Sequence, residues 1–158
     1  MTEKELAEYI SRFHGTVFRL AYSYLKNRED SEDVCQEAFL RLYRSEQSFV
    51  AEENVKAWLL RVTVNLSKNL LKSGWLTRRR ELSEDIPAET PREKALLESV
   101  KLLPQKYGGI LYLYYYEGFS VKEISEITGI SPSAVTTRLS RARKLLKDLL
   151  LKEGYDEN

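Results

Sequence analysis

The chain has 158 residues, a length that fits one domain or two small ones and is sufficient to bury a core. Charged residues make up 31% of it, but the net charge is only +1, which excludes a uniformly polycationic protein. The one cysteine excludes an internal disulfide and fits a reducing compartment, so we expect a cytoplasmic protein. No secretory leader or apolar run of membrane-spanning length occurs, and we therefore expect a soluble protein without membrane insertion.

Charge is segregated along the chain. Residues 56–80 carry seven basic side chains and no acidic one, and residues 131–158 carry six bases against four acids. Between them, residues 81–103 carry six acids against three bases. Two basic segments separated by an acidic one indicate two separate contacts with a polyanion such as a nucleic acid.

The N-terminal part of the chain predicts two amphipathic helices. Apolar side chains recur at steps of three and four from Leu6 to Tyr24, so a helix is expected over residues 3–26. Residues 27–29 should break this helix, and Asp30 can cap a second one.

The second helix has an apolar and a polar side. Cys35 falls on the apolar side and is interpreted as a packing residue, and His14 has no apparent partner, so no metal site is expected. The polar side, taken alone, indicates only a solvated face, and it holds Asp33, Gln36, Glu37, Arg41 and Arg44.

A polar loop is expected over residues 45–54, followed by a third helix from about residue 55. The side chains expected to face inward on this helix are Val55, Trp58, Leu59, Val62 and Leu66. Another flank of the helix lines up Arg61, Asn65, Lys68 and Lys72. Cations can hold phosphates and an amide can bind a base edge, so we favour a nucleic-acid contact over an ordinary solvated face.

Residues 81–93 are acidic and contain two prolines, which marks a boundary. We therefore expect a first domain over residues 1–80, a flexible linker over 81–93 and a second domain over 94–158. In the second domain, a short helix over 94–103 precedes a tyrosine-rich segment, 104–119, whose composition favours a strand. We interpret this segment as a helix because it must pack on the next one, with its tyrosines in the core rather than stacked on bases.

Residues 117–147 predict a helix-turn-helix. Ser120 and Glu123 form a capping box at the start of the first helix, Gly129 ends it, and the Ser-Pro dipeptide that follows begins the second. The second helix has one apolar side, and its opposite side carries Ser133, Thr137, Arg141 and Lys144. Such a helix can enter a major groove, although a helical hairpin with a solvated basic face has the same pattern.

Three motifs occur in order along the chain. Residues 30–39 are DSEDVCQEAF, residues 56–65 are KAWLLRVTVN, and residues 103–146 include EGFSVKEIS and SRAR. They resemble the core-binding signature, the helix that reads the −10 promoter element, and region four of the extracytoplasmic-function (ECF) sigma factors of bacterial RNA polymerase. The resemblance extends over about residues 5–150. It implies an all-α protein of two helical domains joined by a flexible linker.

The resemblance also implies three sets of site residues. Those expected to bind core polymerase are Asp30, Asp33, Gln36, Glu37 and Arg41. Those expected to bind the −10 element are Phe49, Lys56, Trp58, Arg61, Asn65, Lys68, Lys72, Arg78 and Arg79. Within this set, the loop at 48–54 and Asn65 are expected to hold an unstacked base. Those expected to bind the −35 element are Ser133, Ala134, Thr137, Arg138, Arg141 and Lys144.

The chain departs from the family pattern at three places. Gly108-Gly109 replaces a charged or polar pair, and Ser125 stands where a small alanine is common. Residues 136–138, Thr-Thr-Arg, stand where a Lys-Ser-Arg type of run is frequent. The last departure touches base-reading positions and leaves the promoter sequence open.

The expected function is to bind core RNA polymerase, direct it to promoters and assist promoter melting. The expected partners are core polymerase, promoter DNA and an anti-sigma factor, without a cofactor, a small-molecule substrate or catalytic residues. A two-domain regulator with a LuxR-like helix-turn-helix would share residues 118–141, but it needs neither 30–39 nor 56–65. An enzyme with a DNA-binding tail would need an acid, base, nucleophile or metal cluster, and none is apparent in residues 1–80.

Overall fold

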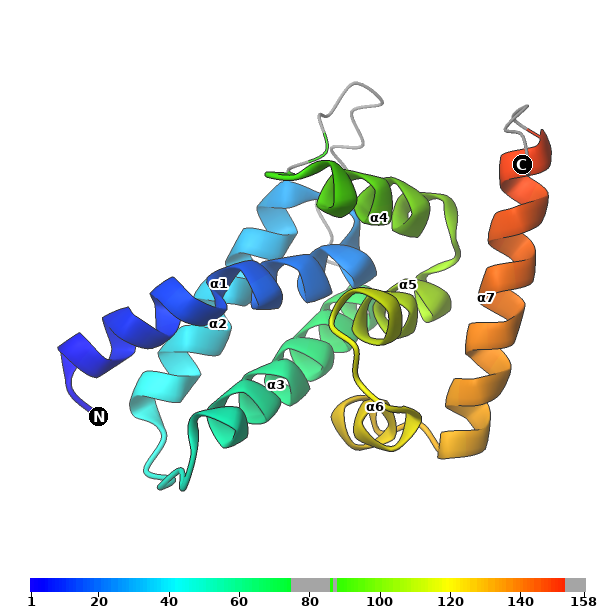
Figure 1. The fold of residues 1–158 in the computed structure, drawn as a ribbon. Helices are drawn as coiled ribbons and strands as arrows, with labels where there is room; N and C mark the ends of the chain where they lie inside the picture. The colour runs from blue at the N-terminus through cyan, green and yellow to red at the C-terminus, as the bar shows by residue number, and fades with distance from the viewer. Residues whose placement is uncertain (75–85, 87, 153–158) are drawn as a thin grey trace. The chain divides into compact units, whose positions relative to one another are not determined.

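In the computed structural model, which describes residues 1–74, 86 and 88–152, every regular element is a helix (Figure 1). The chain divides into two compact units, Met1–Glu84 and Asp85–Asn158. The expected all-α fold with two helical domains is confirmed. None of the described helices is both long enough and apolar enough to span a membrane.

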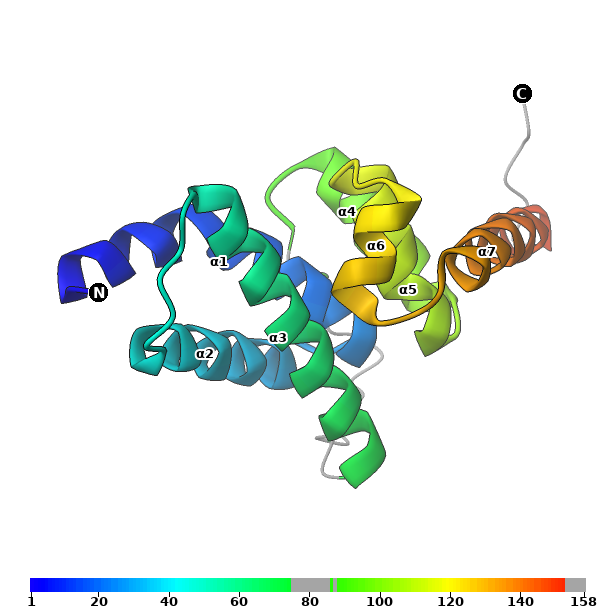
Figure 2. The same cartoon turned by 90° about the horizontal axis from the view of Figure 1, so that it is seen from below.

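The first unit is a three-helix arrangement in which each helix packs against the other two. Its helices are α1 (Glu3–Leu25), α2 (Arg28–Arg44) and α3 (Glu52–Ser73), shown from below in Figure 2. Fully buried leucines contributed by all three helices, Leu20, Leu42 and Leu59 among them, form the core. Burying each such side chain contributes roughly 1.5–3 kcal/mol, so this shared core holds the helices together.

The break between α1 and α2 is shorter than expected and has a different cap. Lys26 ends α1 in the left-handed conformation at φ +62°, and Asn27 caps α2. The side-chain oxygen Oδ1 of Asn27 accepts the backbone N–H of Asp30 at 2.8 Å, and the side-chain Nδ2 of Asn27 donates to the Asp30 carboxylate at 2.6 Å. The prediction that Asp30 caps the helix was therefore wrong, because an equally good capping residue lies three positions earlier.

The third helix starts earlier and buries a different side than expected. It begins at Glu52, so the last three residues of the predicted loop are helical, and the two glutamates of its first turn suit the positive helix end. Its buried side is formed by Val55, Leu59, Leu60, Thr63, Val64 and Ser67. The residues Trp58, Val62 and Leu66, which were expected to face inward, are only half-buried. Thr63 can be buried because its hydroxyl donates to the Leu59 carbonyl at 2.7 Å.

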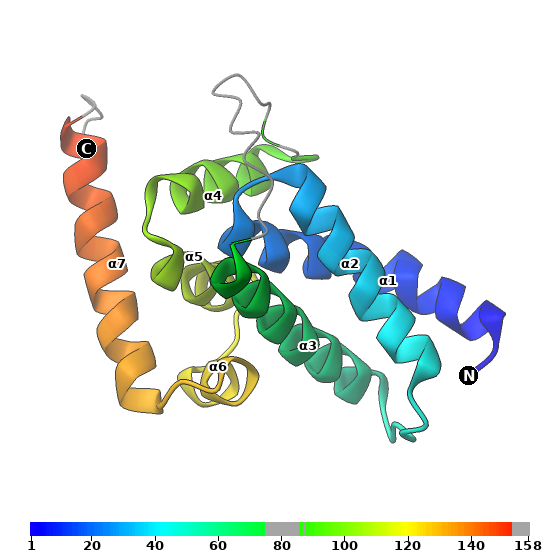
Figure 3. The same ribbon diagram turned by 180° about the vertical axis from the view of Figure 1, so that it is seen from behind.

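The second unit is built on a core between α4, α5 and α7 (Figure 3). Its elements are α4 (Pro91–Leu102), α5 (Gln105–Leu111), a π-helical turn η1 (Tyr112–Tyr116), α6 (Val121–Thr128) and α7 (Pro132–Lys152). The core residues are Val100, Leu103, Tyr107, Leu111 and Ala142. Because Thr90 caps α4 through the backbone N–H of Glu93 at 3.1 Å, the last three residues of the predicted linker are helical.

The tyrosine-rich segment is helical, as expected from its context. Tyr107 and Tyr112 are buried, which confirms the predicted core role for these two side chains. Tyr114 and Tyr115 remain 36% and 45% exposed, so the same prediction was wrong for them. The widening to a π-helix accompanies a hydrogen bond of 2.9 Å from the Tyr112 hydroxyl to the Glu117 carboxylate, five residues ahead.

Candidate nucleic-acid interface

The polar side of α2 is a continuous exposed surface. Asp33, Gln36 and Arg41 are exposed, and Glu37 is half-buried. The Glu37 carboxylate accepts a hydrogen bond from Arg41 Nε at 3.0 Å, one helical turn away. Asp30, which was predicted to belong to this surface, is only 4% exposed and bonds to Asn27. Asp30 is therefore part of the helix cap and not of the exposed surface.

The first unit also contains a contact that the sequence did not predict. His14 Nε2 on α1 lies 3.3 Å from Glu32 Oε2 on α2, so the prediction that His14 has no partner was wrong. Cys35 lies one turn beyond Glu32 and is buried, as expected for a packing residue. Burial, together with the neighbouring Glu32 carboxylate, raises the pKa of the Cys35 thiol well above its ordinary value.

The predicted basic flank of α3 is present. Arg61, Asn65 and Lys72 are exposed and Lys68 is half-buried, at spacings that place them on one side of the helix. Lys56, five residues before Arg61, is also half-buried. Arg78 and Arg79, predicted to extend the same surface, lie outside the described residues.

An aromatic pair adjoins the basic flank. Phe49, in the loop before α3, meets Trp58 edge-on, with ring centroids 6.0 Å apart and planes at 75°. Both side chains are half-buried, and Val50 beside them is 98% exposed. The structure thus brings together two residues that the sequence placed nine positions apart. Together they present partly accessible aromatic rings, the kind of side chain on which unstacked bases can stack.

The helix-turn-helix has the local chemistry that its sequence predicts. The Ser120 hydroxyl accepts the backbone N–H of Glu123 at 3.1 Å, and the Glu123 carboxylate accepts that of Ser120 at 3.0 Å. The second of these bonds lowers the pKa of the Glu123 carboxyl group. Gly129 ends α6 at φ +77°, a left-handed conformation that favours glycine, and Ser131 caps α7 by accepting the N–H of Ala134 at 3.2 Å.

The second helix of this motif, α7, has its apolar and polar sides where they were predicted. Val135, Leu139 and Ala142 are buried. On the opposite side the side chains that are exposed are Ser133, Thr137, Arg141 and Lys144. Ala134 and Arg138, also predicted to contact DNA, are half-buried beside this exposed set.

Two arginines bind the exposed end of the π-helical turn, a feature that the sequence did not predict. Arg92 of α4 donates to the carbonyls of Tyr115 and Tyr116 at 3.3 and 3.2 Å and lies 4.3 Å from the Tyr116 ring centroid. Arg143 of α7 donates to the Tyr115 hydroxyl at 2.6 Å, which raises the pKa of its guanidinium. Partners so distant in sequence leave no periodic signal.

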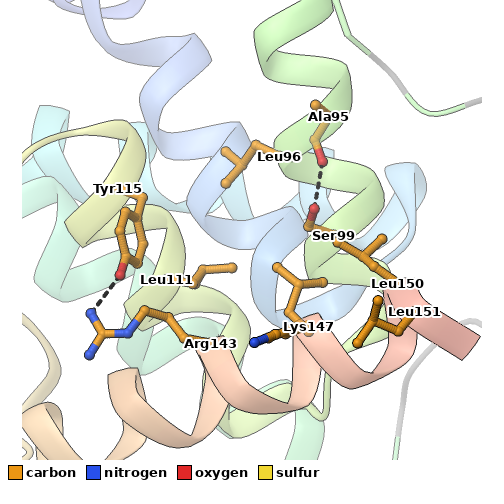
Figure 4. Close-up of a pocket in the computed structure, with 10 residues that line it drawn as sticks. Ala95, Leu96, Ser99, Leu111, Tyr115, Arg143, Lys147, Leu150 and Leu151 are labelled. Carbon is orange, nitrogen blue, oxygen red and sulfur yellow. Dashed lines mark hydrogen bonds between the residues drawn. The ribbon is translucent and has the colours of Figure 1, made fainter. Parts of the chain in front are cut away.

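Tyr115 lies at one end of an apolar groove of about 530 Å³ in the second unit (Figure 4). Leu96, Leu111 and the α7 leucines at 146, 150 and 151 line it. Arg143 and Lys147 lie along its α7 side. At its α4 side the Ser99 hydroxyl donates a hydrogen bond to the Ala95 carbonyl at 2.9 Å. The groove is therefore an apolar surface bordered by two cations.

Comparison with protein families and relatives assigns the two units. Residues 9–77 match Sigma-70 region 2 and residues 93–146 match Sigma-70, region 4. SigV from Bacillus subtilis, an RNA polymerase sigma factor, is 34% identical over 145 residues, which cover 86% of this chain and 85% of SigV. The ECF RNA polymerase sigma factor SigE from Mycolicibacterium smegmatis is 31% identical over 162 residues, which cover 94% of this chain but 63% of SigE.

Solved structures show the same fold. CnrH, in complex with the cytosolic domain of CnrY, superimposes with a TM-score of 0.70 at 23% identity, over 97% of this chain and 92% of CnrH. The sigma factor RpoE from Bartonella quintana, in complex with the anti-sigma factor NepR, superimposes with a TM-score of 0.69 at 19% identity, over 93% of this chain and 97% of RpoE. Both regions of the family are present, in order, together with relatives above 30% identity over most of their length. The chain therefore belongs to the ECF group of the sigma-70 family, the RNA polymerase sigma factors of transcription initiation.

Proposed function

We propose that this chain binds core RNA polymerase, directs it to promoters and helps to melt the −10 region, with the three exposed surfaces each taking one task. The observation that supports this division is the presence of two basic helix faces, on α3 and α7, and a separate mixed-charge face on α2. The chain acts through the polymerase and performs no chemistry of its own.

The α2 surface is the proposed contact with core polymerase. Asp33, Gln36, Glu37 and Arg41 offer both signs of charge and an amide on one exposed side. Complementary charge across an interface sets orientation and partner choice more than raw affinity. Within this surface the Glu37 carboxylate accepts a hydrogen bond from Arg41, one helical turn away, so the two opposite charges lie side by side.

The α3 surface is the proposed contact with the −10 element. Trp58, Arg61 and Asn65 are spaced by three and four residues, so they share one side of the helix. A flipped base needs an aromatic surface to replace its lost stacking, a polar group for its edge and a cation for the adjacent phosphate. These three side chains and Phe49 supply all of these groups.

The α7 surface is the proposed contact with the −35 element. Thr137 and Arg141 occupy successive turns of an exposed helix side that begins with Ser133 near the N-terminus. Short hydroxyls near a helix start can approach base edges closely, while arginine reads guanine or grips phosphate. Lys144, further along, is placed to contact phosphate only.

The groove of the second domain suits an anti-sigma segment. Its apolar lining with Arg143 and Lys147 alongside is complementary to an amphipathic helix that carries acidic residues. Two solved structures of the same fold are complexes, CnrH with the cytosolic domain of CnrY and RpoE with the anti-sigma factor NepR, and the second of these supports proposing an anti-sigma partner here too. Leu151→Glu, at an exposed position of the lining, should weaken such a complex without unfolding the domain.

Transcription in vitro with bacterial core polymerase and a random promoter library tests the function. Addition of the chain should give initiation from a subset of sequences that share two conserved elements. Initiation independent of the chain, or enrichment of one element only, would contradict the proposed division of the two domains. Core polymerase without the chain is the matched control.

A further inference from the structure

The chain contains one histidine and one cysteine in 158 residues, and the fold brings both to the same place. His14 lies on α1, and Cys35 lies on α2, one turn beyond Glu32. Glutamate and cysteine three residues apart on a helix project to the same side, here toward the facing helix. Among the residues that the structure describes, no other group of three or more His, Cys, Asp or Glu side chains converges in this way.

The ligand atoms of the three side chains, one from each, all lie within 4.8 Å of one another. The ligand atoms of a tetrahedral zinc ion lie roughly 3.5 Å apart, given Zn–N, Zn–O and Zn–S distances of about 2.0–2.3 Å. The contact between His14 Nε2 and Glu32 Oε2, at 3.3 Å, already has this spacing. The His14 and Glu32 side chains are 43% and 51% exposed, so small side-chain rotations can bring their ligand atoms to about the same distance from the buried Cys35 sulfur.

We propose that His14, Glu32 and Cys35 form a binding site for one Zn²⁺ ion, with water as the fourth ligand. The ligand types point to this metal, since imidazole and thiolate favour zinc whereas calcium and magnesium take oxygen ligands. The thiol proton is released to solvent on binding, and the thiolate and the carboxylate then balance the two charges of the ion. His14 and Glu32 are partly exposed whereas Cys35 is buried, so the open position lies on the solvent side of the site, where water and the ion have access.

Bound zinc joins α1 to α2 and stabilises the first domain. Any ligand that binds only the folded state stabilises that state by mass action. At a Zn²⁺ concentration about a hundred times Kd, the melting temperature of this domain should rise by roughly 10–20 °C. This inference is independent of the proposed division of promoter contacts, because it concerns a different surface and needs no polymerase or DNA.

The test uses the full chain without an affinity tag, reduced and stripped of metal, with Co²⁺ as a spectroscopic probe. Co²⁺ should bind with 1:1 stoichiometry and give visible bands of tetrahedral cobalt together with a thiolate-to-cobalt charge-transfer band. Since Cys35 is the only thiol, that band can come from no other residue. Zn²⁺ should displace Co²⁺, remove the colour and protect the thiol from alkylation.

Three variants and one control assign the ligands. Cys35→Ala should abolish the charge-transfer band, and His14→Gln and Glu32→Gln should each weaken Co²⁺ binding at least about tenfold. The last two change only partly exposed side chains, so their metal-free melting should match that of the parent chain. Glu8→Gln removes an exposed carboxylate elsewhere on α1 and should change nothing. A missing charge-transfer band in the parent chain, or equal affinity in His14→Gln, would overturn the site.

Discussion

Arg141 is the exposed cation of α7 best placed to read a base, one turn after Thr137 and almost one turn before Lys144. Arg141→Ala should weaken binding of the polymerase–sigma complex to the −35 element by about 1–3 kcal/mol and relax the preference at one base pair. Lys144→Ala should instead weaken binding to all sequences alike and reduce the salt dependence, as the loss of a phosphate contact does. Competition binding against single-base variants of the element, at several salt concentrations, separates the two effects. Unchanged affinity and salt dependence in Arg141→Ala would remove this side chain from the interface.

Asn65 tests a different step, the opening of the duplex. An amide that contacts a flipped base acts only after that base has left the stack. Asn65→Ala should therefore leave polymerase binding intact and reduce the thymine reactivity of the −10 region toward permanganate. Asn65→Gln, which keeps the amide on a longer side chain, should fall between the two. Equal reactivity in Asn65→Ala and the parent chain would mean that Asn65 is an ordinary solvated residue of α3.

At the scale of the elements, the capping box of α6 makes a prediction about pH. The pKa of Glu123 is lowered by the backbone N–H of Ser120 and then by its hydroxyl. Since the folded-state pKa lies below the unfolded one, the stabilisation is complete above the ordinary value of 4.5 and is lost as pH falls through the folded-state pKa. Hydrogen-exchange protection of the α6 amides should therefore fall on acidification, and this fall should be smaller in Glu123→Gln. Ser120→Ala should cost about 0.5–2 kcal/mol at neutral pH. Identical acid sensitivity in Glu123→Gln would contradict this assignment.

The same motif explains which elements the sequence could predict. Ser120, Glu123 and Gly129 act on backbone groups within a few residues of themselves, so the limits of α6 follow from local chemistry. Asn27 obeys the same rule, but it stands three residues before another acceptable cap, and the sequence alone did not decide between them. Local signals therefore predict that a helix cap is present more reliably than they predict which residue provides it.

Features that depend on tertiary packing were predicted less well. The buried side of α3 differs from the expected one in that it includes the polar residues Thr63 and Ser67, which a pattern of apolar side chains does not count. The Thr63 hydroxyl is satisfied inside the helix. His14 meets Glu32 across two helices, and Arg143 meets Tyr115 over twenty-eight residues. Neither pairing has a period that sequence can reveal. Of the candidate site, the exposed stripes of α3 and α7 could be predicted, and the geometry that joins residues from different elements could not.

For the molecule as a whole, the two basic faces are small and are joined through the acidic residues 81–93. Joining two weak sites raises affinity only to the extent that their connection holds them at the right separation. Negative charge near DNA also opposes the cations of both domains. The free chain should therefore bind promoter DNA weakly and with strong salt dependence. Core polymerase can hold both domains at a set spacing, and the affinity that a loose connection loses is then recovered.

Charge reversal on α2 tests whether polymerase provides that spacing. In gel shifts, core enzyme should convert weak promoter binding by the chain into tight, specific binding, and Glu37→Arg should abolish the gain. The substitution also places two cations one turn apart, since Glu37 pairs with Arg41. The double change Glu37→Arg with Arg41→Glu restores that pair but keeps the altered surface, and it should remain defective. Glu8→Arg on α1 is the control for added charge, and circular dichroism should show an intact fold in every variant. Tight sequence-specific binding by the free chain, unaffected by Glu37→Arg, would show that α2 is not the polymerase contact.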